Sequence, residues 1–473
     1  MTLGLILCTI AATMMLPAIV DLADGHPAWS VFFSSSILTF FIGGLLLLFG
    51  YSDEPMQLGI KEGFLLTTIT WVCVAAFAAI PFAGMKLPYT DAFFEAMSGL
   101  TTTGSTILVK LDDLPRGVLL WRSLLQGLGG LGIVVTALIM LPFLRVGGMQ
   151  LFQTESSDRS EKVLPRALEL VTATAAVYAI LMVLCIAAYM GFGMTPFDAI
   201  CHALTTVSTA GFSTHVDSFG FFRTEALHWV CIVFMILGSL PFVIFIRTLR
   251  GEPSALWKDT QVRGFAFLLL SICAIVSFWL MTTKGMPFDD AIRLATFNVT
   301  SIITTTGYTS DDYTKWGPFA VGLFFILMFI GGCSGSTCGG IKIYRLQVAG
   351  MLSRSHFMHL ISPNRVITLK YNGRRLPGDV PFSVVAFLAI YMTTVGFFTV
   401  ILSALGLDLV TALSAAASAL GNVGPGLGET IGPSQNYSNL PATAKWVLSF
   451  AMLLGRLELF TVLVLLRPEF WRS

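Results

Sequence analysis

Long apolar runs separated by shorter polar stretches dominate the pattern of the chain. The first two, Leu3 to Val20 and Trp29 to Phe49, are close enough to form a helical hairpin. The others lie near 64–84, 117–141, 167–190, 225–246, 264–283, 318–331 (with an irregular continuation), 381–405 and 446–466. A helix needs about 20 residues to cross a hydrocarbon layer of about 30 Å. The pattern therefore predicts an all-α polytopic membrane protein with about ten transmembrane helices.

The composition is also typical of a membrane protein. The chain has 473 residues, of which 55% are hydrophobic and 12% charged, whereas soluble domains carry about 25% charged residues. The net charge is +1 and basic residues form no long run, so nothing indicates a nucleic-acid partner. The eight cysteines mostly stand singly in apolar runs, which is unlike a zinc site or a disulfide framework. The first run lacks a basic flank and a small-residue cleavage site, so we expect it to be retained.

Four short segments between the spans repeat one pattern. They read "SGLTTTGST" from Ser98, "TTVSTAGFS" from Thr205, "SIITTTGYT" from Ser301 and "SALGNVGPG" from Ser418. Each centres on a glycine, and the spacings between successive glycines are 107, 96 and 117 residues. Serine or threonine stands six places before each glycine, and threonine or asparagine two places before it. Segments too short to cross survive at membrane depth only where protein or a water-filled path satisfies their backbone.

This repetition predicts an N-terminal hairpin followed by four span–pore-loop–span repeats around one central pore. The expected divisions are 1–62 for the transmembrane hairpin, 63–150 for repeat 1, 151–262 for repeat 2, 263–350 for repeat 3 and 351–473 for repeat 4.

The basic residues indicate an orientation. With a cytoplasmic N-terminus, 18 of the 28 Lys and Arg residues fall in inner loops and the tail, and eight fall outside. Positive residues concentrate on the cytoplasmic side of membrane proteins. Both termini are then cytoplasmic, and all four glycine segments enter from the outer face.

The four segments are candidates for one cation selectivity filter. Extended segments around an axis can replace the hydration shell of a monovalent cation with backbone carbonyl oxygens. Glycine permits the backbone conformations that turn carbonyls inward, and the neighbouring hydroxyl and amide groups add oxygens. The candidate K⁺ ligands are Thr102, Thr103, Gly104, Thr209, Ala210, Gly211, Thr305, Thr306, Gly307, Asn422, Val423 and Gly424.

A short helix is expected before each filter segment. Its C-terminal end would point at the axis and favour a cation there. Asp91, Asp198, Asp289 or Asp290, and Asp408 stand where these helices would begin, as capping residues should. One such segment alone is equally consistent with helix packing by small residues; four matched copies favour a cation path.

With "TTTGST", "STAGFS", "TTTGYT" and "GNVGPG" between paired spans, the chain resembles the Trk/Ktr/HKT superfamily of potassium transporters. The N-terminal hairpin and the run "QTESSDRSEKVLPR" from Gln153 make it most similar to the membrane subunits of bacterial Trk systems. The resemblance extends from Leu3 to Trp471.

The resemblance implies uptake of K⁺, and of rubidium in its place, through a channel-like pore in the bacterial inner membrane. It also implies a homodimer, regulation by a cytosolic ring of TrkA-like nucleotide-binding domains, no bound cofactor and no enzymatic activity. In the superfamily a serine at the first filter glycine goes with sodium transport, so Gly104 favours potassium.

The third repeat holds a gate candidate. After Ile330 the chain reads "GGCSGSTCGGIKIYR", which cannot remain a straight helix because glycines recur among small polar residues. In the family the matching segment is an intramembrane loop that blocks the path below the filter. The candidate gate residues are Gly331, Gly332, Gly335, Ser336, Thr337, Gly339, Gly340, Lys342 and Arg456. A tight helix crossing is the structural alternative for the loop.

Arg456 joins that set because it lies within the last span, where an unpaired charge costs several kcal/mol. Its expected partners are Glu458, carbonyls of the gate loop, or pore-helix ends. By resemblance it projects into the pore below the filter; the alternative is an anchor for the fourth repeat. Arg122, at the start of its span, is expected to snorkel to the interface.

Two other functions stay open. A sodium-selective or sodium-coupled transporter on the same scaffold could have the same filter sequence, because that sequence alone does not settle selectivity. "GCSG" from Gly332 also matches the serine motif of intramembrane proteases, but no histidine is placed to serve as its base.

Overall fold

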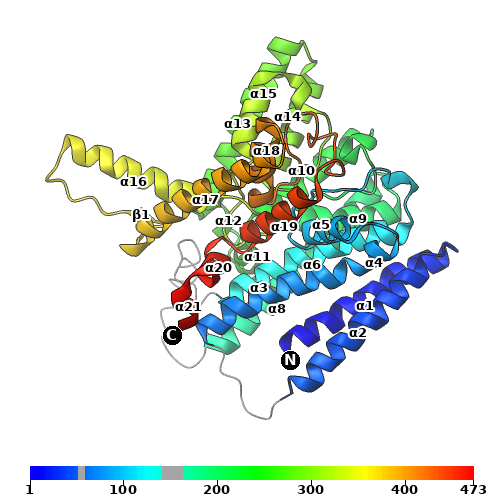
Figure 1. Ribbon diagram of the computed structural model, residues 1–473. Helices are drawn as coiled ribbons and strands as arrows, with labels where there is room; N and C mark the ends of the chain where they lie inside the picture. The colour runs from blue at the N-terminus through cyan, green and yellow to red at the C-terminus, as the bar shows by residue number, and fades with distance from the viewer. Residues whose placement is uncertain (52–58, 141–162, 473) are drawn as a thin grey trace.

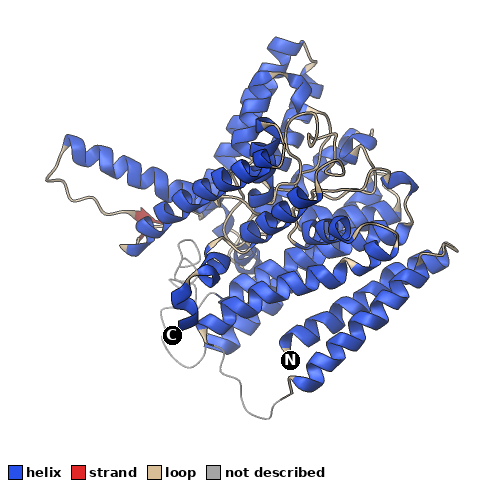
Figure 2. Cartoon of the chain, viewed as in Figure 1, coloured by secondary structure: helices blue, strands red, loops and turns tan. Residues whose placement is uncertain are grey.

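The computed structural model describes residues 1–51, 59–140 and 163–472 and is a bundle of helices (Figure 1). The all-α prediction is confirmed, and Figure 2 shows strands only in one small hairpin within the described chain. Helices long and apolar enough to cross a membrane number seven among these residues. They are α1 (Thr2–Ala23), α2 (Trp29–Phe49), α3 (Ile60–Ala78) continued by α4 (Ile80–Gly84), α6 (Arg116–Met140), α8 (Val163–Gly191), α13 (Thr260–Lys284) and α17 (Asp379–Ala404).

Two further predicted spans are sharply bent. Helix α10 (Glu225–Ser239) meets α11 (Phe242–Leu249) at 93°, and α19 (Ala442–Arg456) meets α20 (Phe460–Leu463) and η4 (Val464–Leu466) at 109°. Pro241 stands at the first bend, where it has no N–H to continue the helix. Glu458 and Leu459 have φ of 57° and 55° at the second. The tenth predicted span is present as the ten-residue α15 (Pro318–Leu327), followed by irregular chain. With each bent pair taken as one span, the described residues hold up to nine.

Four short helices lie between the spans and precede the filter segments. They are α5 (Tyr89–Leu100), α9 (Pro196–Val207), α14 (Phe288–Ile303) and α18 (Leu409–Gly421). Each packs against long helices on both sides: α5 against α6 and α19, α9 against α6 and α8, α14 against α13 and α10, and α18 against α17 and α19. At 12 to 16 residues they are too short to cross a bilayer.

The prediction that an aspartate caps each short helix is correct for one of them. Asp408 caps α18 and accepts from the Thr411 N–H at 3.1 Å. The prediction is wrong for Asp91, Asp198, Asp289 and Asp290, which lie in the first turn instead, because Pro88, Thr195 and Pro287 occupy the cap positions. A carboxylate in the first turn still complements the positive end of the helix dipole.

The two ends of the bundle differ. The short helices η1 (Leu111–Asp113), η2 (Ser218–Phe221) and η3 (Tyr313–Trp316) lie in the loops that follow the filter segments, and this end is called the mouth face. The opposite end, called the hairpin face, carries α12 (Ala255–Lys258), the strands β1 (Lys370–Tyr371) and β2 (Arg374–Arg375), and α21 (Pro468–Arg472). Helix α16 (Ile343–Ile361) leaves the bundle there as a projecting arm (Figure 1).

The N-terminal hairpin is attached to the bundle at the mouth face. Asp21 of α1 is buried, and its Oδ1 accepts from the Gly117 N–H at the start of α6, at 2.6 Å. The division into a hairpin and four repeats stays a prediction. Its boundary at 150 lies outside the described residues, as do residues 153–162 of the run that begins at Gln153.

Candidate functional site

All four short helices end in the same way, with a Schellman motif. The N–H of the residue before each filter glycine donates to the carbonyl six places before that glycine: Thr103 to Ser98 (2.9 Å), Ala210 to Thr205 (2.9 Å), Thr306 to Ser301 (2.8 Å) and Val423 to Ser418 (3.0 Å). The preceding N–H makes the second bond of the motif: Thr102 to Gly99, Thr209 to Thr206, Thr305 to Ile302 and Asn422 to Ala419. This motif requires a left-handed residue after the helix. The residues that supply the accepting carbonyl and the left-handed backbone are those that match six and two places before each glycine in the sequence.

The backbone then alternates in the same way four times. Thr102, Thr209, Thr305 and Asn422 have φ between 51° and 54°, and Gly104, Gly211, Gly307 and Gly424 have φ between 81° and 108°. Left-handed backbone is uncommon for asparagine and unfavourable for β-branched threonine, so the surrounding packing must hold it. Alternating conformations of this kind direct successive carbonyls to one side of an extended segment.

The four glycines lie in a closed cyclic order. A Cβ placed on Gly104 would meet the Ala210 carbonyl oxygen at 2.2 Å, and one on Gly211 would meet that of Thr306 at 1.8 Å. A Cβ on Gly307 would meet the Val423 oxygen at 2.1 Å, and one on Gly424 would return to the Thr103 oxygen at 2.8 Å. Each segment thus touches the next and the last touches the first, so the twelve predicted filter residues form one ring, here called the filter ring.

The ring is rich in buried oxygen. All its threonines and Asn422 are buried, and Thr102 Oγ1 and Asn422 Oδ1 have no hydrogen-bond partner within the described residues. The Gly424 carbonyl accepts from Ser105 Oγ at 2.8 Å and from the Tyr437 hydroxyl at 2.9 Å. A buried ring whose residues offer carbonyl, hydroxyl and amide oxygens suits a weakly hydrated monovalent cation.

A buried ion pair that the sequence pattern did not predict supports the ring. Arg122 is 1% exposed; its Nε lies 2.7 Å from Oε1 of Glu95, a fully buried residue of α5. The same guanidinium donates to the Ser213 carbonyl at 2.9 Å and stacks over the Phe212 ring at 4.1 Å. Arg122 therefore does not snorkel; it ties the first pore helix to the second filter segment. The signal was present as Glu95, an acidic residue inside an apolar segment.

Glycines of the following spans fit against the pore-helix ends. A Cβ on Gly129 would meet the Leu100 carbonyl oxygen at 1.8 Å, one on Gly238 that of Val207 at 2.8 Å, and one on Gly455 that of Leu420 at 2.2 Å. These carbonyls are each four places before a filter glycine. Close backbone approach by glycine is the usual means of tight packing in membranes.

The predicted gate residues form a buried loop directly against the ring on its hairpin-face side. Thr337 Oγ1 lies 3.0 Å from Thr209 Oγ1, and the Gly339 N–H donates to Thr305 Oγ1 at 2.8 Å. A Cβ on Gly339 would also meet the Gly421 carbonyl oxygen at 2.3 Å. The loop therefore contacts the second, third and fourth filter segments.

The same loop is held from the hairpin face. Gly331 N–H donates to the Ile341 carbonyl at 2.6 Å, which closes the base of the loop, and Gly340 is left-handed with φ of 63°. The Gly335 carbonyl accepts from the Phe242 N–H at 3.0 Å, at the bend between α10 and α11. The backbone of Ser334 donates to the side chain of Gln261 on α13 at 2.8 Å. Gly332 and Ser336 are buried within it, and the Ser336 hydroxyl donates to Cys333 at 2.7 Å.

Two buried cations accompany the loop. Arg456 donates to the Thr337 carbonyl at 2.8 Å and reaches the Gly129 carbonyl at 3.4 Å. Lys342 donates to the Cys338 carbonyl. Glu458, one of the expected partners of Arg456, pairs instead with Arg345 at 2.5 Å. Among the three partners the sequence suggested for Arg456, the contact made is with the gate loop.

Comparisons with known proteins cover nearly the whole chain. Residues 28–473 match the family model of TrkH, described as a cation transport protein. The chain is 45% identical to the Trk system potassium uptake protein TrkI of Halomonas elongata, over 100% of this chain and 96% of that protein. It is 35% identical to the Trk system potassium uptake protein TrkH of Escherichia coli, over 99% of this chain and 98% of that protein.

A solved structure is similar throughout. The crystal structure of the potassium transporter TrkH from Vibrio parahaemolyticus matches with a TM-score of 0.91 and 34% sequence identity, over 99% of this chain and 98% of that chain.

Proposed function

The chain belongs to the TrkH family of Trk potassium uptake systems, and we propose that it conducts K⁺ through the filter ring. It is a transporter and not an enzyme, which removes the protease alternative. The observation that carries the proposal is the cyclic contact of Gly104, Gly211, Gly307 and Gly424 with the carbonyls of the next segment. One chain thereby supplies four matched sets of oxygens around one point.

At the ring, protein oxygens replace the water molecules that surround the ion. A K⁺ ion entering from the mouth face sheds its hydration shell and is held by backbone carbonyls, whose fixed positions replace the lost water. The carboxyl ends of the four short helices point toward the same region and add partial negative charge. No step needs covalent chemistry or a bound cofactor. A membrane potential of 100 mV, inside negative, favours entry by about 2.3 kcal/mol per charge.

The loop at 331–340 acts as the gate, with Arg456 and Lys342 as its positive supports. Its contacts with Thr209 and Thr305 support a position across the path of an ion that leaves the ring. The buried guanidinium of Arg456 raises the barrier for a passing cation and holds the loop through Thr337. Opening therefore requires both the loop and Arg456 to move.

The hairpin face is cytoplasmic in this proposal, with both termini on that side and the protein in the bacterial inner membrane. The basic residues of α12, the strands and α21 favour this orientation. The projecting arm supports a homodimer, because Phe357, Leu360, Ile361 and Val366 are exposed on it or just beyond it. A TrkA-like ring with nucleotide-binding domains would dock on the same face and act on the gate.

Ion-specific uptake tests the function. Purified protein in proteoliposomes, with an imposed inside-negative potential, should accumulate labelled rubidium with little labelled sodium, and unlabelled K⁺ should compete. Uptake of sodium at an equal or greater rate would replace the proposal with the sodium-transporting alternative. Adding a nucleotide-binding partner should change the rubidium rate, and it should leave the rank of the two ions unchanged.

A further inference from the structure

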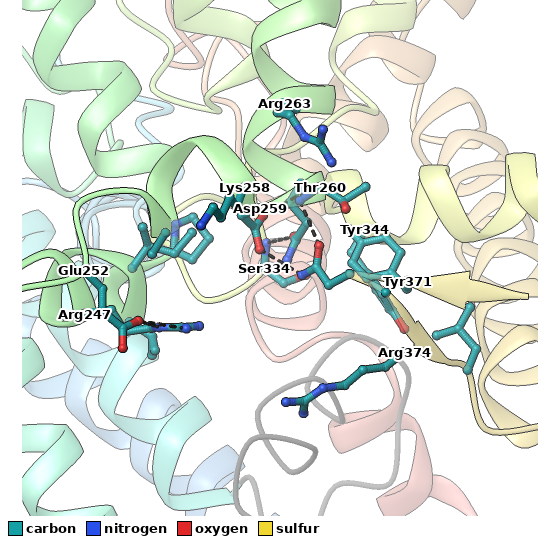
Figure 3. Close-up of a pocket in the computed structure, with 18 of the residues that line it drawn as sticks. Arg247, Glu252, Lys258, Asp259, Thr260, Arg263, Ser334, Tyr344, Tyr371 and Arg374 are labelled. Atoms are coloured by element: carbon teal, nitrogen blue, oxygen red, sulfur yellow. Dashed lines mark hydrogen bonds and ion pairs between the residues drawn. The ribbon is translucent and has the colours of Figure 1, made fainter.

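A cavity of about 620 Å³ opens on the hairpin face beside the gate loop. Its wall is formed by the corner between α11 and α12, the start of α13, the β1–β2 hairpin and Ser334 of the gate loop. Figure 3 shows Lys258 and Asp259 on one side of this space and Tyr371 and Arg374 on the other. The proposed conduction path does not use it.

Among the described residues, the cavity wall carries more basic than acidic side chains. The acidic ones are Glu252 and Asp259. The basic side chains that line it are Arg247, Lys258, Arg263, Arg374 and Arg375. Glu252 is paired with Arg247 at 3.0 Å. Asp259 is occupied as the cap of α13, where it accepts from the Gln261 N–H at 2.8 Å, and it also accepts from Asn372 Nδ2 at 3.0 Å.

A continuous set of hydrogen bonds joins this wall to the gate loop. Asn372, left-handed with φ of 47° at the hairpin turn, accepts from the Thr260 N–H at 2.9 Å. The Thr260 carbonyl accepts from Gln347 at 2.9 Å, and Gln347 accepts from Tyr371 at 2.5 Å. The next residue, Gln261, accepts from the Ser334 N–H at 2.8 Å. A ligand that shifts the hairpin or the start of α13 therefore acts on the gate loop through one side chain.

We propose that this cavity binds a phosphate-bearing anion and that its occupancy favours the open gate. Arginine and lysine side chains facing one space are the groups that recognise phosphate, and the volume suits a small phosphate ester. A bound anion offsets positive charge beside the ion's exit and so lowers the barrier to a leaving cation. The effect on flux rests on the proposed function, whereas the binding does not. The phosphate belongs either to an anionic lipid or to a soluble ester.

Calorimetry with the purified full-length protein tests the binding, with inorganic pyrophosphate as the probe. Lys258→Gln/Arg375→Gln should weaken pyrophosphate binding at least tenfold. Arg354→Gln, on the exposed arm outside the cavity, is the matched control and should bind as the parent does. Unchanged binding in the double variant, or no binding in the parent together with no response to anionic lipid, would overturn the proposal. If the double variant fails to fold, Arg375→Gln alone on the exposed hairpin carries the test.

Rubidium uptake separates the two sources. In vesicles of phosphatidylcholine alone, pyrophosphate on the hairpin face should raise uptake at least threefold if the ligand is soluble. If only added phosphatidylglycerol raises uptake, and the double variant abolishes that response, the ligand is a lipid headgroup. Uptake that responds to neither overturns the coupling to the gate. Absence of any rubidium uptake, with cavity-dependent pyrophosphate binding intact, contradicts the proposed function and leaves the anion site standing.

Discussion

Threonine in a left-handed conformation is the distinctive residue-scale feature of the filter ring. Thr102, Thr209 and Thr305 adopt it, and each such residue costs about 1–3 kcal/mol relative to relaxed backbone. Glycine would avoid this strain. Threonine instead adds a hydroxyl that binds the gate loop, as Thr209 does with Thr337 and Thr305 does with Gly339. The same residue therefore ends a helix, shapes the ring and holds the gate.

Gly104→Ser should weaken discrimination against sodium. The new Cβ would lie 2.2 Å from the Ala210 carbonyl oxygen, so that carbonyl must move and the ring must widen. We expect the rubidium-to-sodium uptake ratio to fall about tenfold or more, equivalent to about 1.4 kcal/mol. Gly396→Ser on α17, where nothing lies within 4 Å of the new Cβ, is the control. An unchanged ratio in Gly104→Ser would contradict the filter assignment.

Arg122→Met should destabilise the protein strongly, because it leaves the Glu95 carboxylate buried without its cation. Removing one partner of a buried pair typically costs about 3–5 kcal/mol. The double variant Arg122→Met/Glu95→Gln removes both charges and should recover part of the lost stability. Thermal unfolding in detergent measures both. Equal melting temperatures for the single and double variants would show that the pair does not support the ring.

His215, on the mouth face, should make the stability of the folded protein depend on pH. Burial lowers its pKa, but the carboxylates of Asp198, 3.7 Å from Nε2, and Asp112 outweigh this and raise the pKa above its ordinary value. Its Nδ1 lies 2.6 Å from Asp112, and its ring stacks on Phe221. His202, the other titratable group nearby on α9, bonds to Ser213.

A group with a raised pKa stabilises the folded state below its unfolded pKa, about 6.5, and that contribution is lost as the pH rises through the folded pKa. The melting temperature of the parent should therefore exceed that of His215→Asn at pH 6, and the difference should shrink by pH 8.5. A difference that grows with pH would show that the neutral imidazole, and not its charge, makes the contact.

In the proposed function, the loop at 331–340 is the element that controls conduction. Arg456→Ala removes the bond to the Thr337 carbonyl and the positive charge beside the ring. We expect basal rubidium uptake to rise several-fold, as it should when 331–340 is shortened. Arg354→Ala on the projecting arm provides a control that keeps the loop intact. Basal uptake at or below the parent rate would assign Arg456 and the loop a purely structural role.

Elements were predictable from the sequence where they repeat. The matches at Ser98, Thr205, Ser301 and Ser418 mark equivalent places in the chain, and the structure ends a short helix at each of them with the same backbone hydrogen bonds. The bend at Leu459 was not predictable. An apolar run has the same sequence pattern whether the helix continues or turns. This turn depends on positive φ at two non-glycine residues.

Long-range partners were the other part that escaped prediction. Arg122 stands at the start of a span, a position typical of snorkelling, and its partner Glu95 lies 27 residues earlier on another helix. The Asn372 contact with the start of α13 spans 112 residues. A local pattern can mark a charge inside an apolar segment, as Glu95 does, but it does not identify the partner, which depends on how separate elements meet.

At the scale of the whole molecule, the ring depends on one chain closing on itself. The contact between Gly424 and Thr103 joins the last filter segment of the chain to the first. Ser105 and Asn422 reinforce that closure by bonding to the Gly424 carbonyl and to Thr103 Oγ1. Displacing any segment removes one quarter of the ring, so the proposed function makes selectivity depend on the complete fold.

Anomalous scattering from rubidium tests this central claim most directly. Crystals of the full-length protein grown in rubidium should give an anomalous peak on the axis enclosed by Gly104, Gly211, Gly307 and Gly424, within coordination distance of carbonyls from all four segments. Replacement of rubidium by sodium should remove it. No peak inside the ring, in protein that takes up rubidium in vesicles, would contradict the account.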